Sequence, residues 1–331
     1  MKADVLVIIL NFNGWRETLP CVDAVLAQTY KSLHIMLIDN GSADDSLQRL
    51  QRFQDHPRIT FVKHAKNLGF AGGVNVGIQH AIKHNYPYIV LLNNDAIIAP
   101  DWLTRLRRTI KKQHVSSVTG LLLSGDGKKI ESTGDGYSRW GLVFPQQRDE
   151  PTAQANESDF VFGGTAGASL YTTELFKDIG LFDETFFAYF EDTDINLRAQ
   201  LAGHKAYYEK SAIGYHDHNT TSKKIPGFTV YQTFKNLPMC LWKNIPLRLF
   251  VPMFFRFYAC YGLMYVRAIL RGQFVIATKG LFMNISLMPH VFSQRWRIQR
   301  ARRISVTDFR DILYPDLPPN NKRTARRIFH R

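Results

Sequence analysis

The first 123 residues alternate short apolar runs with amphipathic or glycine-rich segments. The apolar runs have the composition of buried strands and lie at 5–10, 33–39, 59–64, 88–92 and 117–123. Segments typical of helices lie between them. They occur at 16–28, from the turn residues NGSADDS to about Phe53, at 69–82, and from Pro100 onward. Continuous apolar strands are covered on both faces, and strands that alternate with helices form parallel sheets. The sequence therefore predicts an α/β fold with a mostly parallel sheet and helices on both faces.

The alternation ends after residue 124. Residues 124–160 are polar and rich in glycine, which predicts loops, and residues 160–173 return to small and apolar side chains. Further helices are predicted at 174–179 and at about 191–202.

Charge is distributed unevenly along the chain, whose net charge is +14. Residues from Lys223 onward contain 20 Lys and Arg against three acidic residues, a net charge of +17, whereas residues 1–222 carry −3. We therefore predict a near-neutral globular domain at 1–222 and a basic region at 223–331. A basic region favours an anionic partner, either a membrane or a nucleic acid.

Cysteine usage and the N-terminus bear on the cellular compartment. Cys21, Cys240 and Cys260 are few and far apart, which argues against a disulfide framework and for a reducing compartment. The chain begins with one lysine and a strand-like run, with no small-residue cleavage site after it, so we expect no secretory signal.

Polar side chains follow four of the predicted strands at the point where each strand ends. They lie at 11–13, 39–40, 64–67 and 93–95. One such group alone is typical of a turn or a helix cap, because Asn and Asp favour both. The carboxyl ends of parallel strands meet at the same edge of a sheet, so four groups together predict a shared ligand crevice.

A dinucleotide-binding enzyme would need the pattern G-x-G-x-x-G between its first strand and first helix. The first turn here reads NFNGW and contains one glycine, and the later segment GFAGGVNVG does not have the required spacing. The sequence therefore disfavours a dehydrogenase.

Several motifs together resemble one enzyme family. ILNFNG, LAQTYKSLHIMLIDNGSADDS, NLGFAGGVNVG and LLNNDAII resemble the nucleotide-binding half of family-two glycosyltransferases with the GT-A fold. The segment from FGGTAGASLYTTELF to AQLAGHKAYY, followed by YHDHNTTS, resembles their acceptor half. The chain is most similar to the bacterial rhamnosyltransferase-like branch of that family. The resemblance implies a GT-A (Rossmann-like) domain with a nucleotide-sugar-binding half at 1–123 and an acceptor half at 124–222.

The resemblance gives a role to the polar residues that end the fourth strand. Asn93, Asn94 and Asp95 occupy the place of the family's DxD motif, in which Asp95 matches the metal-binding position and Asn94 the ribose-contacting position. A divalent cation on oxygen ligands stabilises the negative charge that a leaving diphosphate gains. Asn93 departs from the family's Asp, so metal binding rests more on Asp95, the diphosphate and another ligand.

The remaining nucleotide contacts are also carried over from the family. Asp39 matches the acid that accepts a hydrogen bond from the pyrimidine base, and a carboxylate there favours uracil or thymine over cytosine, which lacks the imide N–H donor. The resemblance places Asn11 and Asn13 in the same base and ribose pocket. Asn67 and the GFAGG backbone, with Gly72 in it, lie where the nucleotide approaches, because glycine lets the chain come close.

A cluster of acids begins the helix predicted at about 191–202. Acids at a helix start are favoured by the helix dipole, and Asp194 with Arg198 fits an ordinary i,i+4 pair. We assign Asp194 that structural role. The resemblance makes Asp192 the catalytic base, which an inverting transfer needs to take the acceptor hydroxyl proton. Glu191 is expected to orient the acceptor or the base.

Two histidines two residues apart occur in HDHNTTS at 216–222. Alone, such a pair is more often a surface strand end than a metal site. The resemblance implies that His216 completes the metal site, with His218 in reserve. Imidazole is a common ligand of divalent metals whereas Mg²⁺ prefers oxygen, so we expect Mn²⁺ or Mg²⁺ with a preference for Mn²⁺.

Residues 245–292 of the basic region mix large apolar side chains with spaced cations. The uncharged run between Arg256 and Arg267 is far short of the ~20 apolar residues that span a bilayer. Amphipathic helices lying in an anionic membrane interface are therefore expected, without a transmembrane span. A helical subdomain packed on the catalytic core is the alternative. The high apolar content disfavours a nucleic-acid-binding arm.

The sequence and its resemblance together predict a metal-dependent inverting glycosyltransferase, peripheral on the cytoplasmic face of a bacterial inner membrane. The expected donor is a pyrimidine-nucleotide sugar, with dTDP-rhamnose as the leading choice. The expected acceptor is a polyprenyl-diphosphate-linked saccharide of surface-polysaccharide (O-antigen or cell-wall) synthesis. The alternatives are another UDP- or dTDP-sugar on the same fold, and a non-enzymatic protein that binds membranes or nucleic acid.

Overall fold

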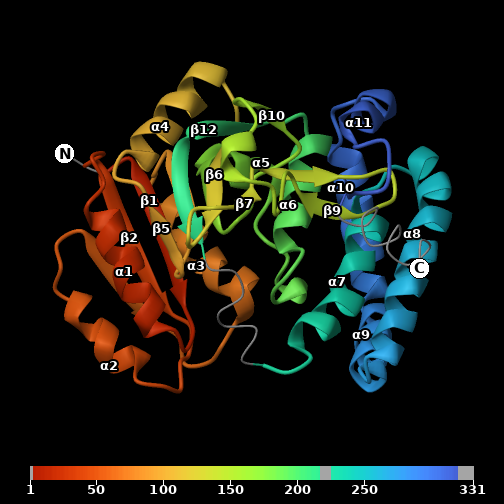
Figure 1. The fold of residues 1–331 in the computed structure, drawn as a ribbon, viewed down its shortest axis with the longest axis horizontal. Helices are drawn as coiled ribbons and strands as arrows, with labels where there is room; N and C mark the ends of the chain where they lie inside the picture. The colour runs from red at the N-terminus through yellow and green to blue at the C-terminus, as the bar shows by residue number, and fades with distance from the viewer. Residues whose placement is uncertain (1–2, 217–224, 320–331) are drawn as a thin grey trace.

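A computed structural model describes residues 3–216 and 225–319 of the chain. Figure 1 shows a twisted central sheet on the left and a layer of C-terminal helices on the right. The strands of the sheet lie in the spatial order β10 (Asp159–Val161), β12 (Ala206–His216), β6 (Ser117–Ser124), β11 (Ala168–Thr172), β4 (Tyr88–Asn93), β1 (Val5–Asn11), β2 (Leu33–Asp39) and β3 (Ile59–Lys63). Shorter strands complete the β-structure: β5 (Ala96–Ile98) pairs with β12, β7 (Ile130–Ser132) pairs with β6, and β8 (Asp135–Tyr137) pairs with β9 (Val143–Pro145).

Strands β4, β1, β2 and β3 are mutually parallel. In their register Asn11 lies beside Asp39, and Leu10 lies beside Asn93. The polar residues that end these strands are therefore brought to one edge of the sheet, as the sequence predicts.

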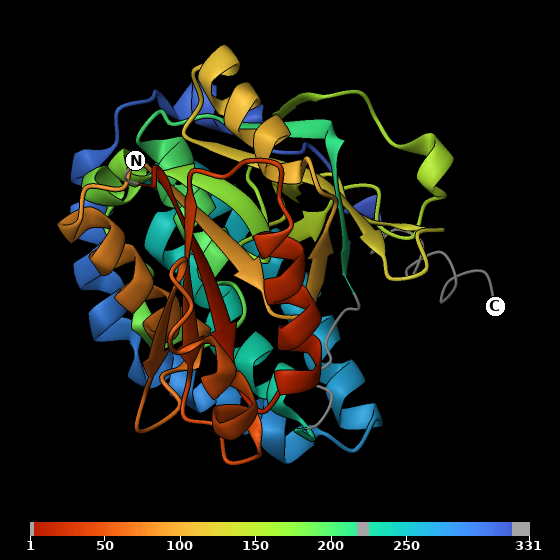
Figure 2. The same cartoon turned by 90° about the vertical axis from the view of Figure 1, so that its left-hand side faces the viewer.

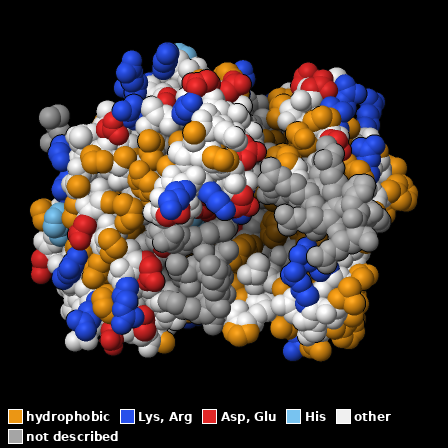
Figure 3. Space-filling view, in the orientation of Figure 1, with side chains coloured by type: hydrophobic (Ala, Val, Ile, Leu, Met, Phe, Trp, Pro, Cys, Tyr) orange, Lys and Arg blue, Asp and Glu red, His pale blue; other side chains and the backbone are white. Residues whose placement is uncertain are grey.

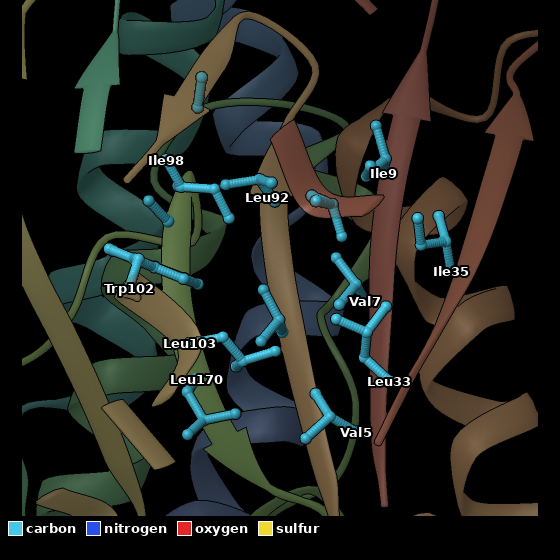
Figure 4. Close-up of a cluster of buried hydrophobic side chains, with 14 of the residues drawn as sticks. Val5, Val7, Ile9, Leu33, Ile35, Leu92, Ile98, Trp102, Leu103 and Leu170 are labelled. Atoms are coloured by element: carbon cyan, nitrogen blue, oxygen red, sulfur yellow. The ribbon is translucent and has the colours of Figure 1, made fainter. Parts of the chain in front are cut away.

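Helices cover both faces of the sheet. The helices of the first 201 residues are α1 (Trp15–Leu26), α2 (Ser46–Leu50), α3 (Gly69–Lys83), α4 (Trp102–Gln113), α5 (Thr173–Ile179) and α6 (Glu191–Leu201), with single 3₁₀ turns at Gln51–Phe53, Thr152–Gln154 and Glu184–Phe186. Val5, Val7 and Ile9 of β1 pack on the side of α1 and α4, in the core drawn in Figure 4. Leu6 and Ile8 pack on the opposite side with α3 and α5. Figure 2 shows α1 lying across the face of the sheet to which Val5, Val7 and Ile9 point.

The predicted strands and helices are all present, but the sheet is mixed. β11 lies between β4 and β6 and is antiparallel to both. The predicted fifth strand, β6, is therefore separated from the parallel group, although it runs parallel to β12. The strand order depends on which distant segments pair, and that information is absent from the local pattern.

The basic region forms five helices among its described residues: α7 (Phe228–Asn244), α8 (Leu247–Leu270), α9 (Phe274–Ser286), α10 (Met288–Ala301) and α11 (Val306–Ile312). The predicted domain boundary at 222/223 lies outside the described residues. Leu237, Cys240 and Leu241 of α7 share one hydrophobic core with Phe186 and Leu197 of the predicted acceptor half. The alternative of a packed helical subdomain is therefore confirmed for α7.

The outer helix α8 is different, because it buries one face only. Phe250, Met253, Phe257, Tyr261 and Ala268 are buried against the bundle. Its other side exposes large apolar residues: Leu247, Val251, Phe255, Leu263, Val266, Ile269 and Leu270. By length and composition alone α8 passes as a membrane-crossing helix, and α9 and α10, bent by 54° relative to each other, pass the same test as a pair.

Candidate active site

One cavity gathers the predicted metal ligands, the predicted acids Glu191 and Asp192, and the predicted nucleotide contacts Asn67 and Asn94, whereas Asn11, Asn13, Asp39 and Gly72 are not among its lining residues. It lies at the carboxyl ends of β1 and β4 and has a volume of about 350 Å³. Its polar wall includes Asn40, Asn67, Asn93, Asn94, Asp95, Thr165, Glu191, Asp192 and His216. A larger cavity of about 580 Å³, between Phe144, Phe160 and Tyr314, contains none of the predicted site residues. The smaller cavity is therefore the candidate active site.

Asn11 and Asp39 form a buried pair beside this cavity. The Asn11 amide donates to Asp39 Oδ1 over 2.8 Å, and the Ser42 hydroxyl donates to the same oxygen over 2.6 Å. Asn11 is fully buried and Asp39 is 2% exposed. Asn11 therefore fixes the orientation of the Asp39 carboxylate from behind. The base-reading role of Asp39 stays a prediction.

Asn13 shapes the loop that follows β2. Its backbone has a positive φ of 51°, and its side-chain oxygen accepts hydrogen bonds from the backbone N–H groups of Ala43 at 2.8 Å and Asp44 at 3.3 Å. The backbone N–H of Asn13 donates to the Ser42 hydroxyl over 2.9 Å. Asn13 thus ties the ends of β1 and β2 together at the predicted nucleoside pocket.

Asn67 and Gly69 lie at the N-terminal end of α3. The Asn67 side-chain oxygen accepts from the Asn40 amide at 3.0 Å and from the backbone N–H of Gly69 at 2.8 Å. Gly69 has a φ of 72°, and a Cβ there would lie 2.3 Å from the carbonyl oxygen of Phe187. Gly69 lines the cavity, whereas Gly72 is buried in the first turn of α3. The close backbone approach at Gly69 is to Phe187 of the protein itself, and the expected approach of a nucleotide to Gly72 stays a prediction.

The turn after β4 carries the candidate metal ligand Asp95, and the end of β12 brings His216 to it. His216 Nε2 lies 2.9 Å from Asp95 Oδ1, and His216 Nδ1 lies 2.8 Å from Glu131 Oε1. Burial alone would lower the pKa of His216, but the hydrogen bonds and charges of Asp95 and Glu131 raise it to about 10. His216 is therefore held between two carboxylates, and metal binding at Nε2 must displace its proton.

These residues fit a divalent cation as a partial ligand set. One carboxylate and one imidazole suit Mn²⁺, and Glu131 on the second ring nitrogen would orient the imidazole, as outer carboxylates do at metal sites. Among the described residues no three His, Cys, Asp or Glu side chains surround one point closely enough to hold a metal alone. The missing ligands would be donor phosphate oxygens and water. No sequence motif indicated Glu131, which lies on the short strand β7.

The two asparagines of the same turn have different partners. The Asn94 amide donates to the Thr18 hydroxyl over 2.9 Å, so its side chain is directed toward α1. The Asn93 amide lies 3.3 Å from His216 Nε2. Asn93 therefore adds a neutral group beside Asp95 where the family pattern has a second carboxylate.

Glu191 and Asp192, the first residues of α6, also line the cavity. Burial raises the pKa of Asp192, and hydrogen bonds from the backbone N–H groups of Thr193 and Ala166 partly oppose this. Burial, reinforced by the charge of Asp192, raises the pKa of Glu191 to about 8. Within the described part of the chain, Glu191 Oε2 is buried without a hydrogen-bond partner. Both acids of the pair thus have raised pKa values, as expected of groups that exchange protons.

Asp135 on β8 is a third acid near this pair, and sequence reasoning missed it. It is 7% exposed, and burial followed by the charge of Asp192 raises its pKa well above the ordinary value. It lies 57 residues before Asp192 in the sequence on a three-residue strand, so nothing in the local pattern indicated it.

Two remaining predictions concern Asp194 and His218. Arg198 Nε donates to Asp194 Oδ2 over 2.9 Å, and Lys243 Nζ binds the same oxygen at 3.0 Å. The structural role of Asp194 is therefore confirmed. His218 lies outside the described residues.

Comparison with known proteins identifies relatives of the first half of the chain. The sequence profile of Glycosyl transferase family 2 matches residues 6–180. An uncharacterized glycosyltransferase of Rickettsia felis is 32% identical over 147 residues, which are 44% of this chain and 23% of that protein. The chain thus spans about a quarter of the length of this relative.

Solved structures share the fold at low sequence identity. GalNAc-T7 with UDP, GalNAc and Mn²⁺ is 17% identical with a TM-score of 0.59, over 73% of this chain and 48% of that chain. The mannosyltransferase PcManGT from Pyrobaculum calidifontis, in complex with GDP-Man and Mn²⁺, is 14% identical with a TM-score of 0.54, over 91% and 86% of the two chains. The expected fold, a mostly parallel sheet with flanking helices and a C-terminal helical region, is confirmed.

Proposed function

Because this chain belongs to glycosyl transferase family 2 and has a GT-A-like fold, we propose that it transfers a sugar, with inversion, from a nucleotide-diphosphate donor to a lipid-linked saccharide. The observation that carries the proposal is the meeting of Asp95 and His216 with Glu191 and Asp192 around one cavity. Rhamnose from dTDP-rhamnose is the proposed sugar and donor, on the resemblance of the motifs to the rhamnosyltransferase-like branch.

The donor side of the cavity supports a nucleoside diphosphate. Asp39, fixed by Asn11, is a carboxylate able to accept from a uracil or thymine imide. Asp95 and His216 would hold Mn²⁺ or Mg²⁺, and such a cation would stabilise the negative charge of the departing diphosphate. Neighbours of the same fold carry UDP or GDP-Man together with Mn²⁺, which supports this choice.

The acceptor side supports base catalysis. Asp192, with a raised pKa, would take the proton from the acceptor hydroxyl as that oxygen attacks the anomeric carbon. Glu191 is protonated near neutral pH, so it would donate a hydrogen bond that orients the acceptor or the base. The two neighbouring acids would therefore have different roles.

A donor screen by thermal unfolding tests the proposal. With Mn²⁺ present, dTDP-rhamnose at a hundredfold excess over its Kd is expected to raise Tm by about 5 °C, because a ligand of the native state stabilises it by mass action. UDP-sugars and GDP-mannose test the alternative donors, and NAD serves as the negative control. The absence of any shift across the nucleotide sugars, with no sugar released from any of them, would contradict an enzymatic role.

We further propose that the outer faces of α8 and α9 rest on the cytoplasmic surface of the inner membrane, where a polyprenyl-linked acceptor would lie. Residues 228–301, from α7 to α10, contain no acidic residue and ten Lys and Arg, so their charge suits anionic lipid. Figure 3 shows hydrophobic side chains at the lower right, over α8 and α9, next to Lys and Arg. Phe255, Leu263 and Phe282 are each at least 66% exposed. We favour an interfacial over a crossing helix because α8 contains Arg256 and Arg267 and buries one face against the bundle.

The double variant Phe255→Glu/Leu263→Glu is expected to lose vesicle binding. Two acids on the lipid-facing surface remove apolar burial and repel anionic headgroups, so the fraction bound is expected to fall at least about tenfold. The measurement is flotation with vesicles of phosphatidylethanolamine and phosphatidylglycerol, with phosphatidylcholine vesicles for comparison.

The matched control is Phe160→Glu, since Phe160 is 51% exposed on the far edge strand β10. Its binding should equal that of the unmodified chain. Release of bound protein by alkaline carbonate supports the interfacial arrangement, and retention would indicate a crossing helix. Equal binding by the double variant, or salt-sensitive binding to RNA instead of vesicles, would contradict the proposal.

A further inference from the structure

Residues 185–190 form a loop, the acid-leading loop, immediately before Glu191, and its backbone is strained. Phe187, Tyr189 and Phe190 have positive φ angles of 62°, 69° and 70°. Bulky residues rarely adopt this conformation, and it persists only where the surroundings over-determine it. Something outside the loop must therefore hold it.

Two adjacent residues of α7 provide this support. The fully buried Asn236 places its amide nitrogen 2.9 Å from the Phe186 carbonyl oxygen, 2.9 Å from that of Ala188 and 2.8 Å from that of Tyr189. Lys235 Nζ donates to the carbonyl oxygen of Phe186 over 3.1 Å. Lys235 Nζ also donates to the carbonyl oxygen of Thr185, the first residue of the loop, over 2.8 Å. Two α7 side chains thus contact four carbonyl groups of the loop, those of residues 185, 186, 188 and 189.

The other side of the acid-leading loop is pressed against α3. The backbone N–H of Ala71 donates to the Phe187 carbonyl oxygen over 3.2 Å. At Gly69 the approach is so close that a Cβ would lie 2.3 Å from the same oxygen. The loop is therefore clamped between the helix on the donor side and the first helix of the basic region.

The clamped loop also forms the wall of the cavity. Phe187, Tyr189 and Phe190 line it, and so does Phe228 from the first turn of α7. The Phe228 ring lies 6.3 Å from that of Phe187 and 6.0 Å from that of Tyr189, between centroids. The Lys235 ammonium also acts on Glu191, lowering its pKa against the larger rise caused by burial. Helix α7 thus contacts the candidate site through its backbone supports, a wall residue and a charge.

We infer that α7, which lies beyond the segment matched by the family profile, is part of the active site, with Asn236 and Lys235 as positioning residues that fix the acid-leading loop and thereby place Asp192. This inference rests on the proposed function for its kinetic consequence. Its structural content does not, because the clamp is defined by hydrogen bonds alone.

The test compares Asn236→Leu with Asn244→Leu. Both asparagines are fully buried on α7, but Asn244 donates to Asp194 over 2.9 Å and does not contact the loop. Both variants lose a buried hydrogen-bonding group and are expected to lose similar stability. Only Asn236→Leu should release the loop, measured as faster amide hydrogen exchange over 185–190. Misplacing the base is expected to lower turnover of the donor found in the screen about 10²-fold, with binding of UDP and Mn²⁺ within about twofold of the unmodified chain.

Several outcomes would overturn the inference. Equal loop exchange and equal turnover in the two variants would show that Asn236 is an ordinary core residue. Should Asn236→Leu fail to fold, Lys235→Met replaces it and Lys235→Arg tests rescue; unchanged exchange and turnover in Lys235→Met would also be contradictory. If the unmodified chain turns over no nucleotide sugar, the proposed function fails, whereas the exchange comparison still decides whether α7 holds the loop.

Discussion

Asp192→Asn is expected to lower the turnover of the nucleotide sugar by about 10²- to 10⁴-fold, the range for losing a positioned general base. The amide keeps the shape of the side chain and cannot take a proton. Binding of UDP with Mn²⁺ should change by no more than about twofold, because the proposed role of Asp192 is toward the acceptor and not toward the donor. Initial rates at saturating donor, together with calorimetry of UDP binding, measure the two effects separately.

The pH dependence and a neighbouring variant sharpen this prediction. Burial raises the pKa of Asp192, so its carboxylate becomes protonated at a higher pH than that of an ordinary aspartate. As the pH is lowered, turnover should therefore begin to fall at a pH above the ordinary aspartate pKa of about 3.9. Glu191→Gln keeps a hydrogen-bond donor and is expected to cost only about tenfold, within the range of a modest positioning loss. Full turnover by Asp192→Asn would show that Asp192 is not the base. A much greater loss of turnover in Glu191→Gln than in Asp192→Asn would indicate that Glu191 is the base instead.

Local sequence patterns predicted the parallel strands at one side of the sheet and one edge of the site, but not β11 or β12. The apolar runs predict β1, β2, β3, β4 and β6 because a strand buried on both faces must be apolar throughout. The polar residues that end β1, β2 and β4 then meet because parallel strands align their carboxyl ends. The local pattern therefore indicates that Asp39 and Asp95 follow strand ends, while their common edge also depends on the pairing of β1 with β2 and β4.

Other parts of the site depend on contacts that no local pattern records. Glu131 and Asp135 lie on the short strands β7 and β8, and each reaches the site only after its strand has packed. β11 enters the sheet between β4 and β6, and its register brings Ala168 beside Leu92. Nothing in the residues 160–173 alone specifies this partner.

The basic region illustrates how one amphipathic pattern has two structural outcomes. Apolar residues with spaced cations predicted interfacial helices, yet Lys235 and Lys243 of α7 are buried, with Lys243 Nζ bonded to Asp183 at 2.6 Å and to Asp194 at 3.0 Å. A buried cation stays charged where carboxylates pair with it, so a helix with basic residues is able to enter a core. The number of charged residues alone does not distinguish the buried helix α7 from the partly exposed helix α8. The difference depends on whether acidic residues elsewhere in the fold pair with the cations of the helix.

Asp95→Asn is expected to weaken Mn²⁺ binding in the presence of UDP and to lower turnover by about 10²- to 10³-fold, since a metal that acts as a Lewis acid contributes several kcal/mol to the transition state. The amide lacks the negative charge that attracts the cation, and it leaves His216 with Glu131 as its remaining bonded carboxylate. Calorimetric titration of Mn²⁺ into the UDP complex measures the affinity. Treatment with a chelator should abolish turnover of the unmodified chain, and Mn²⁺ should restore it.

A graded series distinguishes a metal site from a merely structural ion pair. Glu131→Gln removes only the outer partner of His216, so Mn²⁺ affinity is expected to fall by about 10- to 100-fold, with turnover restored by high Mn²⁺. Glu157→Gln, a change at an exposed glutamate paired with Lys210, should alter neither quantity. If Asp95 and His216 served only to pair with each other, Asp95→Asn would lower Tm without changing Mn²⁺ affinity, and added Mn²⁺ would rescue neither variant. Rescue of Glu131→Gln by metal, together with the failure of Asp95→Asn to recover, is the combination that a cation held by Asp95 and His216 requires.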